Sequence, residues 1–260
     1  MCVTRVDPER KRTVLVTGAS RNIGRHLAIR FGEAGYNVVA CARNGETLEP
    51  VAAGIREGGG SAIGIPADVA DPNSVESMFS KIENQFGGVD ILINNAVARV
   101  VMPIEEMTFD QWRLTLGVTL DAAFNCSKAA VPFMRANSWG RIINVAGKAS
   151  FSGTAKRVGL NTAKSGIIGF TRGMARELGP DGITVNAVSP GRIDTERGDW
   201  TAVGDVKDAM ARYERGTAEI AVGRMGTLDE VTSLFLYLSS DSAAFITGDV
   251  ISVNGGSLIR

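Results

Sequence analysis

A glycine turn between a strand and a helix constrains the fold of this chain more than any other feature. The turn spans Thr17–Gly24 and has the sequence TGASRNIG. The apolar and mostly β-branched stretch Thr13–Val16 comes just before it and predicts a buried strand. Ile23, Leu27 and Phe31 follow at helical spacing and predict an amphipathic helix. A strand, a glycine turn and a helix in this order favour a dinucleotide-binding unit.

The glycines of the turn suit this role for physical reasons. Gly18 allows the chain to reverse tightly, and Gly24 allows the helix to begin close to the strand and to a bound pyrophosphate. The first turn of the helix then offers free N–H donors and the positive end of the helix dipole to phosphate oxygens. An ordinary βα loop without a ligand is the alternative interpretation.

The length and charge of the chain exclude several classes of protein. A chain of 260 residues, 44% hydrophobic and 22% charged, can bury the core of an enzyme-sized globular protein. Its 28 Lys and Arg residues balance its 28 Asp and Glu residues, which argues against a nucleic-acid-binding protein. The chain has no apolar run long enough to span a membrane, and the charged tail Met1–Arg12 does not have the pattern of a signal peptide. We therefore expect neither nucleic-acid nor membrane binding.

Cysteine and histidine are too scarce and too scattered to predict a metal site. Cys2, Cys41 and Cys126 show no metal-ligand spacing, and His26 is the single histidine. We expect no metal, and we expect His26 to be a packing or surface residue. The scattered cysteines favour a reduced, cytoplasmic compartment.

Strand and helix signals alternate along the rest of the chain. Strands are predicted at 13–16, 37–42, 62–66, 89–93, 140–145, 184–188 and 250–253, and further helices at 46–57, 72–86, 109–134, 160–178 and 228–238. This alternation predicts an α/β fold, with a doubly wound, Rossmann-type parallel sheet covered by helices on both faces. We expect a single domain over residues 13–260, preceded by the tail 1–12.

Several motifs, found in order along the chain, carry a resemblance to a known family. They are Thr17–Gly24, Asp68–Val69, Asn94–Ala96, Lys164, Ser189–Thr195, and Thr247–Gly248 with Val253–Gly256. Through them the chain resembles the short-chain dehydrogenase/reductases from Thr13 to Leu258. The resemblance implies a sheet of about seven strands, a nicotinamide cofactor, a segment at 192–222 that covers the substrate, and a homotetramer or homodimer.

The same resemblance implies a set of cofactor-binding residues. They are Gly18, Ser20, Arg21, Asn22, Ile23, Gly24, Asp68, Val69, Asn95, Ala96, Val97, Lys164, Pro190, Gly191, Ile193 and Thr195. Asn22 and Val97 stand where the family usually has glycine. Asparagine enters left-handed conformations more readily than most residues, so we expect Asn22 to be tolerated. Val97 is bulkier than glycine and can crowd the cofactor.

The charge around the predicted adenosine site favours NADP(H) over NAD(H). An NAD site typically places a carboxylate at the end of the second strand, where it accepts a hydrogen bond from the ribose 2′-OH. Here that position is Ala42, followed by Arg43, and Arg21 lies in the glycine turn. Two guanidinium groups and no carboxylate suit a 2′-phosphate. The alternative is that both arginines are solvated surface residues.

The positions that carry catalysis in the family hold different residues in this chain. The family uses a Tyr four residues before a Lys, a Ser thirteen residues before the Tyr, and an Asn on the preceding long helix. The corresponding positions here are Leu160, Lys164, Gly147 and Thr119, so only the lysine remains. Leucine has no proton to give and glycine has no hydroxyl. The resemblance therefore implies an atypical member that lacks the usual Asn, Ser and Tyr.

Other polar residues are candidates to frame the substrate pocket. They are Lys148, Ser150, Ser152, Lys156, Arg157 and Asn161. Arg99 is a candidate partner for a substrate carboxylate, with a solvated surface position as the alternative for both Arg99 and Lys148. In the covering segment, Trp200, Met210 and Tyr213 suggest a partly apolar pocket, although helix–helix packing explains them equally. Lys148 follows the vacated Ser position, so its ammonium could polarise a carbonyl or act as an acid or base.

Three hypotheses about function remain open. The first, which we prefer, is an NADP-preferring oxidoreductase that acts on a small carbonyl or alcohol with Lys148 and Lys164 as its catalytic residues. The second is a non-redox enzyme on the same fold that catalyses an elimination, hydration or decarboxylation. The third is a catalytically silent subunit that partners an active homologue. The sequence does not identify the substrate.

Overall fold

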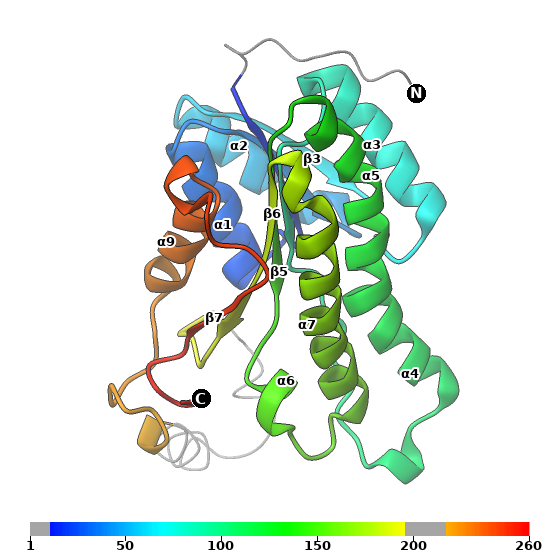
Figure 1. Cartoon of the computed structure of the whole chain (residues 1–260). Helices are drawn as coiled ribbons and strands as arrows, with labels where there is room; N and C mark the ends of the chain where they lie inside the picture. Colours follow the sequence, from blue (N-terminus) through cyan, green and yellow to red (C-terminus); the bar gives the residue numbers. More distant parts are fainter. Residues whose placement is uncertain (1–10, 196–216, 260) are drawn as a thin grey trace.

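Seven parallel strands form the sheet around which the computed structural model of the chain is built (Figure 1). The structure describes residues 11–195 and 217–259. The strands lie in the order β3-β2-β1-β4-β5-β6-β7. Their bounds are β1 Thr13–Thr17, β2 Asn37–Ala42, β3 Ser61–Pro66, β4 Ile91–Asn94, β5 Gly140–Val145, β6 Ile183–Pro190 and β7 Val250–Val253. The predicted doubly wound sheet is confirmed.

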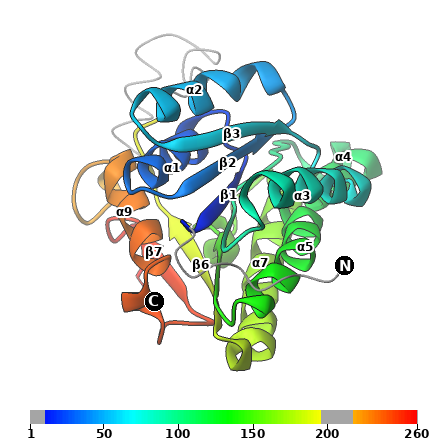
Figure 2. The same cartoon turned by 90° about the horizontal axis from the view of Figure 1, so that it is seen from above.

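Helices cover both faces of the sheet (Figures 1 and 2). One face carries α1 (Asn22–Glu33), α2 (Glu49–Glu57) and α9 (Leu228–Leu238), and the other carries α3 (Pro72–Phe86), α5 (Ala122–Ala136) and α7 (Val158–Leu178). Each layer has its own apolar core against the sheet, one around Phe31 and Phe235 and the other around Met78 and Met134. The strands are buried on both faces because helices pack on both, which explains why apolar residues predominate in them without alternation.

The order of the strands fixes where a ligand can bind. β1 pairs with β2 on one side and with β4 on the other, so the chain winds outward in opposite directions from this point. Crossover connections on opposite faces leave a crevice beyond the carboxyl ends of these two strands. The glycine turn Thr17–Gly24 and the loop that begins at Asn95 both start at this crevice.

The conformation of the glycine turn agrees with its sequence. Gly18 adopts φ +67° and Asn22 adopts φ +51°, so the left-handed conformation expected to be tolerated at Asn22 is confirmed. A Cβ atom added at Gly24 would lie 2.1 Å from the carbonyl oxygen of Gly18. Only glycine fits there, because α1 begins directly against the turn.

The structure differs from the sequence-based prediction over the helix expected at 109–134. In place of one helix, the chain forms α4 (Phe109–Leu116), a π-helical turn (Gly117–Asp121) and α5, which ends at Ala136. The π turn inserts a residue into the helical repeat, and hydrophobic periodicity does not reveal such an insertion. The structure also contains a short helix, α6 (Ala149–Ser152), in what was expected to be the loop before α7.

Parts of two predicted segments lie outside the described residues. These parts are 1–10 of the charged tail and 196–216 of the covering segment, which holds Trp200, Met210 and Tyr213. Among the helices of the described ranges, none combines the length and the apolar character that a membrane span requires.

The contact at Gly24 gives a test of the turn. Gly24→Ala should lower the free energy of unfolding by about 1–3 kcal/mol, because the methyl group overpacks against the Gly18 carbonyl. Urea unfolding measures this change. Gly54→Ala in α2 is the control, because a Cβ there meets no atom within 4 Å and should stabilise the helix by about 0.5–1 kcal/mol. Equal effects of the two substitutions would contradict the close packing of the turn.

Candidate functional site

Hydrogen bonds from two side chains hold the glycine turn against the loop after β4. The Oγ1 atom of Thr17 accepts from the backbone N–H groups of Asn95 and Ala96, at 3.0 and 3.1 Å. The side-chain amide of Asn95 donates to the carbonyl oxygens of Thr17 and Gly18, at 2.9 and 3.1 Å. The Asn95 amide donors therefore hold the turn in place. Thr17 was not predicted as a site residue, although its position directly before Gly18 is a signal that could have revealed it.

The N-terminus of α1 is open to an anion. Arg21, at the N-cap position, makes no side-chain capping bond, and the first turn holds no acidic residue. By contrast, the side chains of Asp71, Thr108 and Thr227 cap α3, α4 and α9. The Oδ1 atom of Asn22 is buried without a hydrogen-bond partner. The free N–H donors of an uncapped helix start fit the diphosphate of a dinucleotide. The Asn22 oxygen is an acceptor, so it suits a hydroxyl donor such as that of a ribose and not the phosphates.

The predicted adenosine side of the site has two arginines at its surface. Arg21 and Arg43 are both exposed, and Arg43 directly follows β2. Asp68 is exposed and its carboxylate accepts from the N–H of Ala70 at 3.0 Å, while Val69 is 5% exposed. The residue at the end of β2 is Ala42, so it offers no carboxylate to a ribose 2′-OH.

The segment after β6 forms the opposite wall of the crevice. The N–H of Gly191 donates to the carbonyl of Val253 at 3.0 Å, and Ile193 forms an isolated bridge with Gly226. Farther along the segment, the Oγ1 atom of Thr195 is buried without a partner. An unpaired buried hydroxyl is available to a polar ligand. Pro190 and Val97 are half-buried.

Lys164 lies on α7 and is 7% exposed. Its ammonium donates to the carbonyl oxygen of Val145, at the carboxyl end of β5. Burial, and to a smaller extent the positive charge of Arg99, together lower the pKa of Lys164 to about 7. An amine with a pKa near 7 exchanges protons at neutral pH, which an ordinary lysine does not.

The three positions of the expected Asn, Ser and Tyr lie on the π turn, after β5 and on α7. Leu160 lies one helical turn before Lys164 and is 6% exposed. Thr119 lies within the π turn, 4% exposed, and its Oγ1 atom has no hydrogen-bond partner. A Cβ added at Gly147 would meet no atom within 4 Å, so this position leaves open space. Position 160 therefore carries no tyrosine phenol, and position 147 carries no serine hydroxyl.

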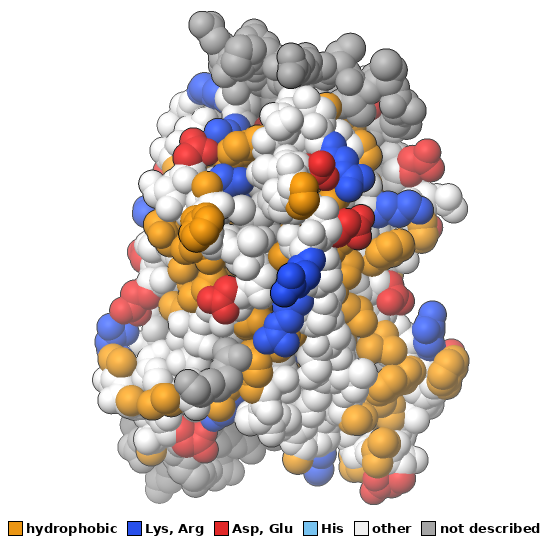
Figure 3. All heavy atoms as spheres, viewed as in Figure 1, with side chains coloured by type: hydrophobic (Ala, Val, Ile, Leu, Met, Phe, Trp, Pro, Cys, Tyr) orange, Lys and Arg blue, Asp and Glu red, His pale blue; other side chains and the backbone are white. Residues whose placement is uncertain are grey.

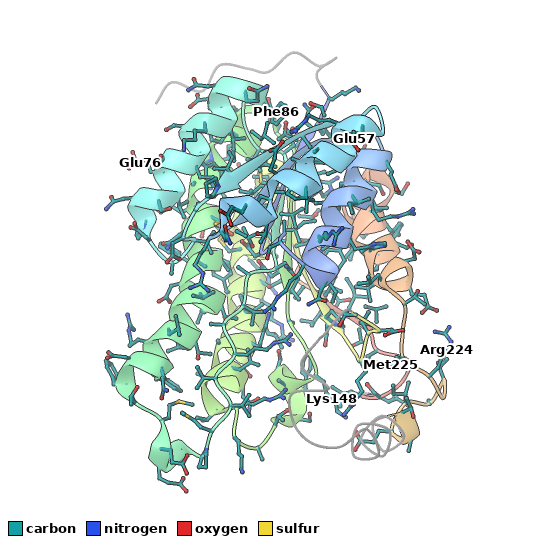
Figure 4. All side chains as sticks on the ribbon, turned by 180° about the vertical axis from the view of Figure 1, so that it is seen from behind. Glu57, Glu76, Phe86, Lys148, Arg224 and Met225 are labelled. Carbon is teal, nitrogen blue, oxygen red and sulfur yellow. The ribbon has the colours of Figure 1, made fainter. Side chains whose placement is uncertain are left out.

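Lys148 has a partner that the sequence did not reveal. Its Nζ atom lies 2.9 Å from the Oε2 atom of Glu219, a residue 71 positions later in the chain. This bond and the charge of Lys148 lower the pKa of the Glu219 carboxyl. No sequence signal could have joined these residues, because α7 and β6 lie between them in the chain. Figure 4 shows Lys148 at the lower edge of the molecule, beyond the strand ends.

The remaining pocket candidates have mostly structural partners. The hydroxyl of Ser150 donates to the carbonyl of Lys164 at 3.0 Å, and the side-chain amide of Asn161 donates to that of Thr154 at 2.9 Å. Ser152 donates within α6, and Lys156 and Arg157 are exposed. These bonds fasten α6 and the following loop to α7. Away from the site, His26 lies 3.1 Å from Asp229 and links α1 to α9.

Comparisons with known proteins agree with this geometry. A family model described as enoyl-(acyl carrier protein) reductase matches residues 18–257. The 3-oxoacyl-[acyl-carrier-protein] reductase FabG of Aquifex aeolicus is 37% identical over 243 residues, which cover 93% of this chain and 95% of that protein.

Among the residues that the structure describes, no group of three or more His, Cys, Asp or Glu side chains could hold a metal ion.

Two solved structures are also similar. The crystal structure of YwfH, an NADPH dependent reductase involved in bacilysin biosynthesis, has a TM-score of 0.89 and 29% identity, covering 96% of this chain and 99% of that chain. A putative short-chain alcohol dehydrogenase from Sinorhizobium meliloti 1021 has a TM-score of 0.89 and 33% identity, covering 95% of this chain and 96% of that chain.

The lowered pKa of Lys164 predicts that the free energy of unfolding depends on pH. The folded pKa lies below the unfolded one, so between pH 10.5 and 7 the unfolded chain binds a proton that the folded chain does not. The protein without dinucleotide should therefore lose stability as the pH falls through this window. The Lys164→Met variant has no such proton to lose. Its free energy of unfolding should therefore rise relative to that of the wild type by about 1 kcal/mol for each unit by which the pH falls within this window.

Urea unfolding at pH 7.5, 8.5 and 9.5 measures this difference. The control is Lys81→Met on the exposed side of α3, for which the difference from wild type should not change with pH. A constant difference for Lys164→Met would mean that Lys164 is charged in the folded protein throughout.

Proposed function

The chain belongs to the short-chain dehydrogenase/reductase family, a family of oxidoreductases, and from this premise we propose that it is an NADP(H)-preferring oxidoreductase of a small carbonyl or alcohol substrate. In this proposal its acid/base chemistry depends on Lys164, with Lys148 assisting, in place of a serine and a tyrosine. The observation that carries it is the buried Lys164 amine, with a pKa of about 7, in a crevice that fits a dinucleotide.

The names of the relatives support a redox reaction over a non-redox one. The Aquifex relative is named a reductase of 3-oxoacyl groups, and YwfH is described as an NADPH dependent reductase. Reduction of a carbonyl needs a hydride and a proton. A bound nicotinamide ring supplies the hydride, or accepts it in the reverse direction.

The residues proposed to hold the dinucleotide are those of the crevice. Its diphosphate would meet the uncapped N-terminus of α1, and the Thr195 hydroxyl is available to the nicotinamide end. The preference for NADP(H) is supported by Arg21 and Arg43, whose exposed guanidinium groups suit a 2′-phosphate. It is also supported by Ala42, where an NAD site would present a carboxylate.

The proposed proton donor for the substrate oxygen is the ammonium of Lys164. At neutral pH the group exists in both forms, so it can give a proton during reduction and accept one during oxidation. The carbonyl of Val145 accepts from Nζ and so orients it. Lys148 lies next to the open space at Gly147, from where its ammonium can polarise the substrate oxygen while Glu219 holds it in place.

Two other functions have specific observations in their favour. The leucine at 160 and the glycine at 147 suit a non-redox enzyme, an elimination, hydration or decarboxylation catalyst that uses the same lysines as acid and base. The same residues suit a catalytically silent subunit that binds a dinucleotide and partners an active homologue.

We also propose that the chain assembles with further copies of itself, as a dimer or tetramer. Phe109, Leu114 and Phe124 are 73%, 46% and 52% exposed on α4 and α5. Figure 3 shows hydrophobic side chains gathered over this part of the surface. Tyr237 and Phe245 are also exposed near the end of α9. Exposed apolar residues of this size are typical of interfaces.

A carbonyl and alcohol panel tests the proposed reaction. The recombinant chain alone should oxidise NADPH with at least one ketone or aldehyde, followed at the nicotinamide absorbance. Lys164→Met should lower kcat/KM by about 10²–10⁴-fold because it removes the proton donor. Lys148→Ala should lower it by about 10²-fold because it removes a cation that stabilises the developing oxyanion. Lys81→Met, far from the crevice on α3, should leave it unchanged.

Each alternative has its own result in this assay. Product formation without a change in nicotinamide absorbance would identify the non-redox enzyme. No turnover of any compound in either direction, together with co-purification of a homologue that keeps Ser, Tyr and Lys, would identify the silent subunit. Undiminished turnover by Lys164→Met would remove Lys164 from the mechanism.

A further inference from the structure

Four buried polar side chains form a hydrogen-bonded row in the layer that α5 and α7 make with the sheet. The side-chain amide of Asn94 donates to the Oγ atom of Ser127 at 3.3 Å and to the Oδ1 atom of Asn144 at 2.8 Å. The amide of Asn144 in turn donates to the Oγ1 atom of Thr171 at 2.9 Å. All four residues are at most 7% exposed, so a bond that is broken here is not readily replaced by water. This row, the asparagine network, joins β4 and β5 near their carboxyl ends to α5 and α7.

The direction of these hydrogen bonds is fixed by a backbone carbonyl. The hydroxyl of Thr171 has one hydrogen atom, which it donates to the carbonyl of Ile167 at 2.7 Å. Its oxygen therefore acts as an acceptor towards Asn144, and the amide nitrogen of Asn144 points towards it. The Asn144 side chain then presents its Oδ1 atom to Asn94. The network thus needs a hydroxyl at position 171, and both a donor and an acceptor at position 144.

α7 is attached to β5 at two adjacent strand residues. Thr171 accepts from Asn144, and the ammonium of Lys164 donates to the carbonyl of Val145. Lys164 and Thr171 lie on the buried face of α7, about two helical turns apart. Apolar packing has no preferred direction, whereas hydrogen bonds fix where a helix lies along a strand. The bond between Asn144 and Thr171 is therefore a second fixed point for the helix that carries Lys164.

The other end of the network reaches the glycine turn. Asn94 directly precedes Asn95 in the chain. The side-chain amide of Asn95 donates to the carbonyls of Thr17 and Gly18. One continuous path thus runs from the turn that is proposed to hold the dinucleotide to the helix that carries Lys164. Transfer of a hydride and a proton to one substrate requires that their two sources keep fixed positions relative to each other.

We propose that Asn144 and Thr171 are positioning residues for Lys164. Their hydrogen bond holds α7 so that the Lys164 ammonium stays at the carbonyl of Val145. This inference rests on the proposed oxidoreductase function, because it assigns the residues that place its proton donor. Asn144 and Thr171 carry no charge, and within the described ranges Arg99 is the charged side chain that acts on Lys164. Neutral substitutions in the network therefore leave the charges around the amine unchanged, and an effect on its titration reports a change in its surroundings.

Two substitutions at Thr171 test the proposal. Thr171→Val keeps the shape of the side chain and removes the acceptor of the Asn144 amide, whereas Thr171→Ser keeps the hydroxyl. With a carbonyl substrate from the panel, Thr171→Val should lower kcat about 10–100-fold, the effect of an unpaired buried donor, with a smaller change in KM. Thr171→Ser should keep most of the activity. Thr162→Val is the matched control and should leave kcat unchanged, because the Thr162 hydroxyl donates to the carbonyl of Val158 in the same way but is exposed.

The titration of Lys164 supplies a readout that does not need turnover. NMR of the protein with isotope-labelled lysine side chains, assigned with Lys164→Met, follows the pKa of Lys164, which is about 7 in the wild type. Thr171→Val should raise this pKa by about 1, because the unpaired Asn144 amide admits water and burial is the main cause of the low pKa. Thr171→Ser and Thr162→Val should leave it at about 7.

The outcomes separate this inference from the proposed reaction. A pKa of Lys164 that rises in Thr171→Val and not in Thr171→Ser, without NADPH oxidation by the wild type, would keep the positioning role and refute the oxidoreductase. Wild-type turnover that falls in Thr171→Val with an unchanged or lower pKa, or that does not fall at all, would overturn the inference and keep the oxidoreductase. Equal losses in Thr171→Val and Thr171→Ser would also overturn it, because the hydroxyl would then not be the cause.

Asn144→Ser is a second variant in case Thr171→Val does not fold. It offers a hydroxyl to Asn94 and loses the bond to Thr171, so the same fall in kcat and the same rise in the pKa of Lys164 are expected. A folded Asn144→Ser protein with the kcat and the Lys164 pKa of the wild type would refute the inference.

Discussion

The close contact between the two glycines of the first turn is the constraint on which the rest of the site depends. Gly24 lies so near the carbonyl of Gly18 that a methyl group would not fit, and α1 therefore starts against the end of β1. Asn95 donates to the carbonyls of Thr17 and Gly18 and so locks the turn to the loop after β4. These contacts fix the turn against the loop at the point where the sheet winds in both directions.

This rigid frame presents an unusual chemical interior. The frame fits a dinucleotide, because the start of α1 has no side-chain cap and leaves its N–H donors free for phosphate oxygens. In our proposal the chemistry next to it depends on Lys164, whose pKa is lowered by burial and by the charge of Arg99. Leu160 supplies no phenol one helical turn away. In our proposal the lysine gives and accepts the proton in place of the tyrosine.

The sequence predicted the fold well because the fold depends on local patterns. Apolar strands and amphipathic helices have periodicities that are visible in the sequence. The glycine turn is recognised by its residue types, including Asn22 in the left-handed conformation. The π turn around Thr119 could not be predicted, because it leaves the helical pattern almost unchanged. The ion pair of Lys148 with Glu219 could not be predicted either, nor could the hydrogen bonds from the Asn95 side chain to the glycine turn. Such contacts join distant segments and arise only in the folded chain.

Fluorescence titration with NADPH and NADH tests the central claim most directly, because every function proposed for this crevice begins with a bound dinucleotide. We predict that NADPH binds more tightly than NADH. The double substitution Arg21→Ala and Arg43→Ala should weaken NADPH binding by about 10–100-fold, the effect of a lost charge-assisted contact, and leave NADH binding nearly unchanged. Arg176→Ala, an exposed position on α7, should change neither. If neither dinucleotide binds, or if both lose affinity equally in the double variant, the account is contradicted.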